Sequence, residues 1–251
     1  MPLIFNRRRR CSFHLAQPAF AEKIEAAEAS LRHAAEHGVT SVNDMADASS
    51  FEVYQELERR GGLTTRVNVY IPIAEVETLT RLKMKSPFGG AHLRLAGLKG
   101  FVDGSLGSAT AYFFDPYTDA PDKSGLLHAH MFPDGVMEKR VMEADRAGLQ
   151  VAIHAIGDRA NSVLLDIFER TAAANGPRDR RWRIEHAQHL RPADVDRFGR
   201  LGVVASVQPY HLIDDGRWAE RKIGPARAKT TYAVQCLRPA GATLAFGADW
   251  T

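Results

Sequence analysis

Residues 150–158 have the sequence Gln150-Val151-Ala152-Ile153-His154-Ala155-Ile156-Gly157-Asp158. This stretch gives the clearest indication of the fold. A short apolar run bounded by turn residues favours a buried strand, here over 150–155. Helical spacing follows over 158–174, and a second apolar run comes next at 182–186. A strand, a helix and another strand in this order predict a β-α-β unit with parallel strands.

The same unit repeats on both sides of this stretch. Strands are expected at 39–43, 65–71, 93–102, 150–155, 182–186, 203–207 and 242–247, and helices near 18–37, 50–60, 74–85, 134–147, 158–174, 192–201 and 224–239. Seven strands separated by helices predict an α/β fold, a (β/α)8 TIM-like barrel that is incomplete by one strand. The segment 103–132 interrupts the repeat, and a loop of that length in a compact domain is usually functional.

Composition and charge exclude several classes of protein. The 251 residues are 45% hydrophobic and 25% charged, as in a globular domain. The net charge of +3 comes from Arg7–Arg10, without which the remainder carries −1. We therefore expect residues 1–17 to form a basic disordered tail before a barrel domain at 18–251, with no nucleic-acid partner and no membrane segment. Two cysteines, Cys11 and Cys236, favour reduced thiols and a cytoplasmic location.

The ends of the predicted strands carry the side chains that could bind a metal or take part in catalysis. Catalytic groups of parallel barrels come from the carboxyl ends of the strands. Here those ends present His154, His186 and finally Asp249, and an earlier strand contains Lys99. Imidazoles and a carboxylate suit zinc and similar ions, and an open coordination position activates water. The pattern predicts a metal-dependent hydrolase.

Four motifs in this order resemble the YtcJ-like branch of the amidohydrolase superfamily, the amidohydrolase-3 family. They are Lys99-Gly100-Phe101-Val102-Asp103-Gly104-Ser105-Leu106-Gly107-Ser108, His154-Ala155-Ile156-Gly157-Asp158, Ile184-Glu185-His186-Ala187-Gln188 and Gly247-Ala248-Asp249-Trp250. The resemblance extends from about residue 20 onward.

The resemblance implies a divalent metal site, most simply zinc with one or two ions. Lys99 would be carbamylated and bridge the ions, since an ammonium cannot bind a cation whereas a carbamate can. His154 and His186 would be ligands, and Asp249 would be a ligand and the catalytic proton carrier. The implied reaction is hydrolysis of carbon-nitrogen bonds other than peptide bonds, in amides or N-substituted formamides.

The sequence departs from this family at its beginning. Members carry a His-x-His pair at the end of the first barrel strand and a small β domain, and neither is recognisable here. We expect barrel strands two to eight, at most one firmly bound ion and weak hydrolysis. Two unpaired sheet edges would also favour association of copies into a homo-oligomer.

The other polar residues near the predicted strand ends are not expected to be primary metal ligands. Contact with a small-molecule substrate, or support of the ligands, is expected of Asp103, Glu185, Gln188 and His211. His189 is expected to be exposed, and His128 and His130 should lie outside the site because they precede a helix rather than end a strand. Two alternatives stay open: an ester or phosphoester hydrolase on the same site, and a truncated, non-catalytic metal-binding barrel.

Overall fold

One sheet of parallel strands forms the centre of the computed structural model, which describes residues 18–249. Its strands follow chain order: β1 (Ser41–Asp44), β2 (Arg66–Pro72), β4 (Leu93–Phe101), β5 (Val151–Ala155), β6 (Arg183–His186), β7 (Val204–Val207) and β8 (Thr243–Phe246). A short strand, β3 (Phe88–Gly89), pairs antiparallel with β4. The predicted order of parallel strands is confirmed. The expected basic tail, residues 1–17, lies outside the described residues.

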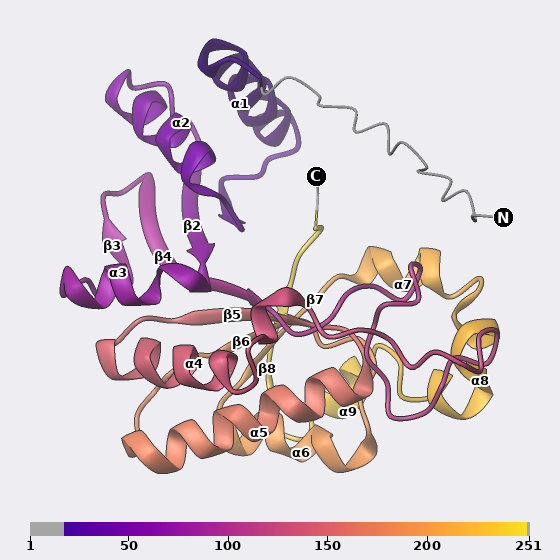
Figure 1. Ribbon diagram of the computed structural model, residues 1–251. Coiled ribbons are helices and arrows are strands. Elements are labelled where there is room, and N and C mark those ends of the chain that lie inside the picture. Colours follow the sequence, from indigo (N-terminus) through magenta and orange to yellow (C-terminus); the bar gives the residue numbers. More distant parts are fainter. Residues whose placement is uncertain (1–17, 250–251) are drawn as a thin grey trace, which may run out of the picture.

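Helices alternate with the strands as expected. They are α1 (Phe20–Glu36), α2 (Ala48–Arg59), α3 (Val76–Arg81), α4 (Val136–Ala147), α5 (Asp158–Asn175), α6 (Pro192–Leu201), α7 (Pro209–Asp215), α8 (Ala219–Ala228) and α9 (Val234–Leu237), with 3-10 turns η1 (Ile73–Glu75) and η2 (Ala129–Met131). Figure 1 shows α4, α5 and α6 along one side of the sheet, and α7 and α8 at the end opposite α1 and α2. None of the helices in residues 18–249 is long and apolar enough to cross a membrane.

The predicted helix at 224–239 is wrong. The structure has α8 and α9 in its place, and α7 directly after β7 was not expected at all. Gly224 adopts a left-handed φ of 77° inside α8, and Pro225 follows it. Proline lacks the N–H that would continue the ladder of hydrogen bonds, so the helix breaks there. The chain instead makes several short helices between β7 and β8.

The main core lies between β4–β8 and the helices α3–α6. Trp182 and Phe168 stack at its centre, with ring centroids 4.5 Å apart, and both are fully buried. Aromatic side chains of this size contribute much of the apolar area that stabilises a core. A separate cluster that includes Ile24, Val53 and Leu57 packs α1 and α2 against β2. The strand ends that carry polar groups are therefore held on a rigid, well-packed support.

The long segment 103–132 has a small core of its own. Leu106, Phe113 and Tyr117 pack against Ile156 after β5 and Ile223 on α8. Gly157 permits this docking, because a Cβ atom there would lie 2.1 Å from the carbonyl oxygen of Tyr112. The loop is thereby fixed beside the carboxyl ends of the strands.

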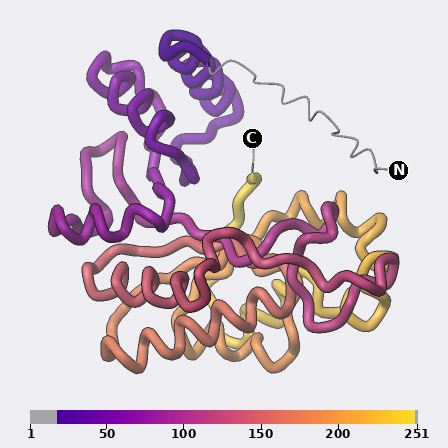
Figure 2. The backbone as a smooth tube through the Cα atoms, viewed as in Figure 1, coloured from indigo at the N-terminus to yellow at the C-terminus, as the bar shows by residue number. Residues whose placement is uncertain are grey.

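The sheet curls without closing. Within residues 18–249, β1 pairs only with β2 and β8 only with β7. Figure 2 shows the chain passing around the curl from its indigo end to its yellow end. Met45, just after β1, and Asp249, after β8, line the same pocket. The incomplete TIM-like barrel expected from the sequence is therefore present, and its open side is flanked by the first and last strands.

Candidate metal centre

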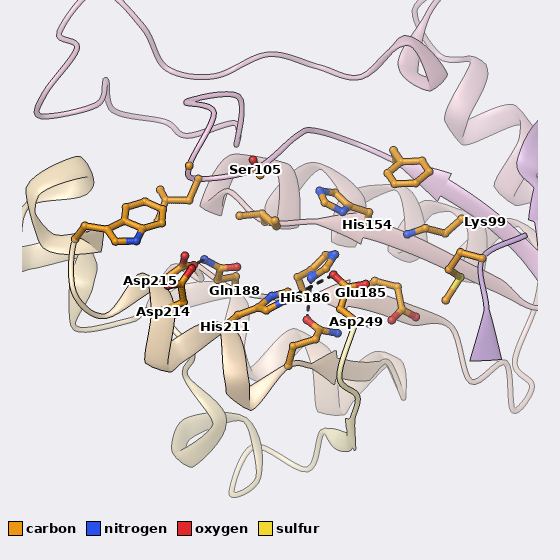
Figure 3. Close-up of a pocket in the computed structure, with 17 residues that line it drawn as sticks. Lys99, Ser105, His154, Glu185, His186, Gln188, His211, Asp214, Asp215 and Asp249 are labelled. Carbon is orange, nitrogen blue, oxygen red and sulfur yellow. Dashed lines mark hydrogen bonds and ion pairs between the residues drawn. The ribbon is translucent and has the colours of Figure 1, made fainter. Parts of the chain in front are cut away.

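The side chains predicted to bind a metal converge on one pocket of about 490 Å³. Lys99 comes from β4, His154 from β5 and His186 from β6, and Asp249 follows β8. Figure 3 shows these four side chains gathered around the same space. Parallel strands bring their carboxyl ends to one edge of the sheet, so residues up to 150 positions apart meet there.

His186 is buried and held in a defined orientation. Its Nδ1 lies 2.8 Å from Oε1 of Gln208, an acceptor, so Nδ1 carries the proton and Nε2 keeps its lone pair. Burial and the neighbouring His154 hold the pKa of His186 well below its ordinary value. Its φ of 77° is left-handed, which is uncommon for a side chain of this size and marks strain at a functional position. A neutral, oriented imidazole is suited to metal binding.

His154 stands beside His186, with ring centroids 4.5 Å apart. Its Nε2 lies 2.9 Å from the carbonyl oxygen of Gly104 and 3.4 Å from Oδ1 of Asp103. Nε2–H therefore donates to the loop after β4, which leaves Nδ1 as the acceptor or ligand atom in this arrangement.

Lys99 is buried in the strand beside the histidines. Burial lowers the pKa of its ammonium group to about 8, while the carboxylates of Glu185 and Asp249 oppose that shift. Its Nζ lies 4.2 Å from the centre of the Phe101 ring. Glu185 also lines the pocket and pairs with Arg183 at 2.8 Å. A neutral amine is accessible at Lys99 near neutral pH, which an ordinary lysine does not offer.

Asp249 and His211 face each other at the mouth of the pocket, with Nε2 and Oδ2 3.7 Å apart. Together with His186 they form a group of three whose ligand atoms all lie within 4.8 Å of one another. A second group of this kind in the described residues, His33, Glu36 and His37, is exposed at the end of α1 and does not line the pocket.

Asp103 does not line the pocket, although it is buried directly behind it. Its carboxylate accepts hydrogen bonds from three backbone amides: Ile156 at 3.0 Å, Gly157 at 2.8 Å and Tyr112 at 2.8 Å. It thus ties the loop after β4 to the turn after β5. Of the two roles expected for Asp103, the structure favours support of the site over contact with a substrate.

A second set of polar residues lines the far end of the pocket and was missed from the sequence. Asp214, Asp215 and Trp218 lie on or after α7. Asp215 accepts hydrogen bonds from the amide of Gln188 and, at 2.8 Å, from the hydroxyl of Tyr232. The only signal in the sequence was the pair of acidic residues four positions after Pro209-Tyr210, and it depends on α7, which was not expected.

The expectation that His189 is exposed is wrong. Its side chain is buried, with Nδ1 2.8 Å from the hydroxyl of Thr231 and Nε2 3.1 Å from the amide nitrogen of Gln188. The amide of Gln188 donates to Nε2, so Nδ1 carries the proton and donates to Thr231. Burial lowers the pKa of His189 to about 3. The ring is a neutral link in the network that holds α7.

His128 and His130 lie outside the pocket lining, as expected. His128 caps the short turn η2 and His130 lies within it. Both rings pack on Phe101, with ring centroids 5.0 Å and 5.6 Å from its own. Their His-x-His spacing therefore serves the packing of a loop against β4.

Comparison with known sequences places this chain in a family. A model of the amidohydrolase family matches residues 7–251. Protein LONG AFTER FAR-RED 3 of Arabidopsis thaliana is 42% identical over 242 residues, which cover 91% of this chain and 41% of the plant protein. Putative amidohydrolase YtcJ of Bacillus subtilis (strain 168) is 31% identical over 173 residues, which cover 69% of this chain and 32% of the bacterial protein.

A solved structure has the same fold. An uncharacterized metal-dependent hydrolase from Pyrococcus furiosus superposes with a TM-score of 0.81 at 34% identity, over 92% of this chain and 47% of the archaeal chain. The chain thus spans less than half the length of each of these relatives. From the match of nearly its whole length, and from the strand-end groups that meet in one pocket, this chain belongs to the amidohydrolase family.

Proposed function

We propose that this chain forms the metal-binding half of a hydrolase that cleaves carbon-nitrogen bonds other than peptide bonds, in amides or N-substituted formamides. One observation carries the proposal: Lys99, His154, His186 and Asp249 all line the same pocket. The family match and the metal-dependent archaeal relative support the same reaction class. The specific substrate is a small molecule, in keeping with a pocket of about 490 Å³.

The donor set fits a divalent ion of the zinc type. His186 offers a neutral Nε2 with its other nitrogen hydrogen-bonded to an amide oxygen, the arrangement typical of metal-bound histidines. Asp249 adds a carboxylate within reach of that ring. Together with His154 and Lys99, which line the same pocket, these residues would hold one ion firmly, and we expect the 251-residue chain to retain at most one per molecule.

Lys99 would join the site as a carbamate. Its neutral amine nitrogen would attack the carbon of CO2, form an N–C bond and lose one proton, which yields an anionic group. The lowered pKa of Lys99 favours this reaction near neutral pH, because only the neutral amine is a nucleophile. The new carboxylate-like group would then belong to the pocket that His154 and His186 also line.

When bound, the ion would lower the pKa of water and polarise a carbonyl oxygen. The chain's own residues would handle the proton. Asp249 would take it from the attacking water at a carboxylate oxygen and pass it to the leaving nitrogen as the C–N bond breaks. Asp249 has a left-handed φ of 52°, a backbone conformation that aspartate adopts more readily than most residues.

We further propose a cytoplasmic location and self-association of copies. The exposed thiol of Cys236 suits a reducing compartment. Both proposals are secondary to the reaction and are tested by fractionation and by sedimentation.

Metal analysis and amine release test the function together. The purified chain should retain up to one zinc ion and release amine slowly from N-formyl and N-acyl amines. His186→Ala should lose both properties, whereas His92→Ala, an exposed histidine before β4, should keep them. Adding ¹³C-bicarbonate should produce a carbamate resonance in the wild type and none in Lys99→Ala. Equal zinc content in the wild type and His186→Ala would refute the proposed site.

A further inference from the structure

Helix α7 brings a third imidazole to the proposed metal centre. The helix begins at Pro209, immediately after β7, and its third residue is His211. Proline is well suited to the first turn of a helix because its missing N–H would have no partner there. The short turn points His211 into the pocket, where Figure 3 shows it next to Asp249 and His186.

The distances between the ligand atoms of these three residues are only slightly longer than those in a zinc-bound site. One ligand atom from each of the three residues lies within 4.8 Å of those of the other two, and Nε2 of His211 is 3.7 Å from Oδ2 of Asp249. Tetrahedral zinc with bonds of about 2.0–2.1 Å needs ligand atoms about 3.4 Å apart. Side-chain movements that shorten these distances by up to about 1.4 Å would close the remaining gap, with no movement of the strands.

His186 and the helix that carries His211 are held from outside the group. Gln208 accepts from Nδ1 of His186 and donates its amide to the carbonyl oxygen of Ser206, which fixes the ring and the start of α7 together. The far end of α7 is anchored where Asp215 accepts from Gln188 and Tyr232. The rings of His186 and His211 lie nearly parallel, at 15°, with centroids 5.9 Å apart.

His154 is less well placed to complete this group. Neither of its ring nitrogens belongs to the group of ligand atoms within 4.8 Å that His186, His211 and Asp249 form. In the described residues, the imidazole that groups with both His186 and Asp249 is therefore His211.

We propose that His211 is itself a ligand of the divalent ion, so that His186, His211 and Asp249 form a two-nitrogen, one-oxygen site for zinc or cobalt. This inference rests on the proposed metal site and adds to it a ligand from α7, a helix that follows a strand end. His211 then binds the ion directly, a role that differs from the substrate contact or ligand support expected from the sequence. Before Lys99 is carbamylated, such a site has three protein ligands and keeps one position open for water.

Cobalt titration of the full 251-residue chain tests this assignment without any activity measurement. Affinity is measured by competition with a chelator, and coordination by the visible absorption of bound Co²⁺. His211→Ala should weaken Co²⁺ binding about tenfold or more and alter the absorption bands. His186→Ala should do the same, and His92→Ala should leave both unchanged. His211 is partly exposed, so its replacement should not unfold the chain, which circular dichroism checks.

The outcomes separate the two proposals. If His211→Ala and a second variant, His211→Asn, keep affinity within twofold of the wild type while His186→Ala loses it, the metal site stands and His211 is not a ligand. If His186→Ala also binds Co²⁺ with the affinity of the wild type, both the proposed metal centre and this inference are wrong. Loss in both His186 and His211 variants, with unchanged His92→Ala, establishes the assignment.

Discussion

The carboxylate of Asp103 connects the fold to the site, and its removal should be costly. In Asp103→Ala the amides of Ile156, Gly157 and Tyr112 lose their acceptor. A buried donor left without a partner costs about 1–3 kcal/mol, and the first two of these amides are buried. With a smaller contribution from Tyr112, the free energy of unfolding should fall by about 3–7 kcal/mol. That is a large share of the roughly 5–15 kcal/mol of a typical domain.

Asp103→Asn separates charge from geometry. The amide oxygen can replace Oδ2, which serves Gly157 and Tyr112, while the amide nitrogen would then face the N–H of Ile156. One lost acceptor predicts a smaller decrease, about 1–3 kcal/mol. Asp122 is exposed and offers a matched control, for which alanine should change stability by less than about 0.5 kcal/mol.

Urea denaturation followed by circular dichroism measures all three variants. The expected order of unfolding free energies is wild type and Asp122→Ala together, then Asp103→Asn, then Asp103→Ala. A loss below about 1 kcal/mol in Asp103→Ala would show that the three amides find other acceptors or water, and the assigned role would be wrong.

Three other outcomes follow from the geometry. The first concerns His189, which above pH 6.5 is neutral in both the folded and the unfolded chain. Below pH 6.5 only the unfolded chain protonates this ring, so the free energy of unfolding should fall by about 1.4 kcal/mol per pH unit toward pH 3. Denaturation curves of His189→Gln should lack this part of the pH dependence. Gly157→Ala forces a Cβ onto the Tyr112 backbone and should lower the melting temperature, with a cost of about 1–3 kcal/mol, whereas Gly62→Ala meets nothing closer than 3.6 Å and serves as its control. The double variant His128→Ala/His130→Ala should keep the metal content of the wild type in elemental analysis, and a loss of metal would assign these rings to the site.

The order of the strands and the identity of the strand-end residues were predictable because both are local properties. A buried parallel strand is a short apolar run, a helix has its own period, and their alternation implies a parallel sheet. The carboxyl ends of such strands meet at one edge, so Lys99, His154, His186 and Asp249 could be expected in one pocket before any coordinates. They do line one pocket.

The partners of those residues depend on contacts between distant parts of the chain. The hydrogen bond from His186 to Gln208 spans 22 residues, and the amides bound by Asp103 lie up to 54 residues away. The position of His211 next to Asp249 requires both the curl of the sheet and the short helix α7. No period or motif records these distances, because they result from the packing of whole elements against one another. The sequence alone therefore predicted which strand ends carry the candidate ligands. Only the tertiary structure decided which hydrogen bonds these side chains form, which of them are buried and which line the same pocket.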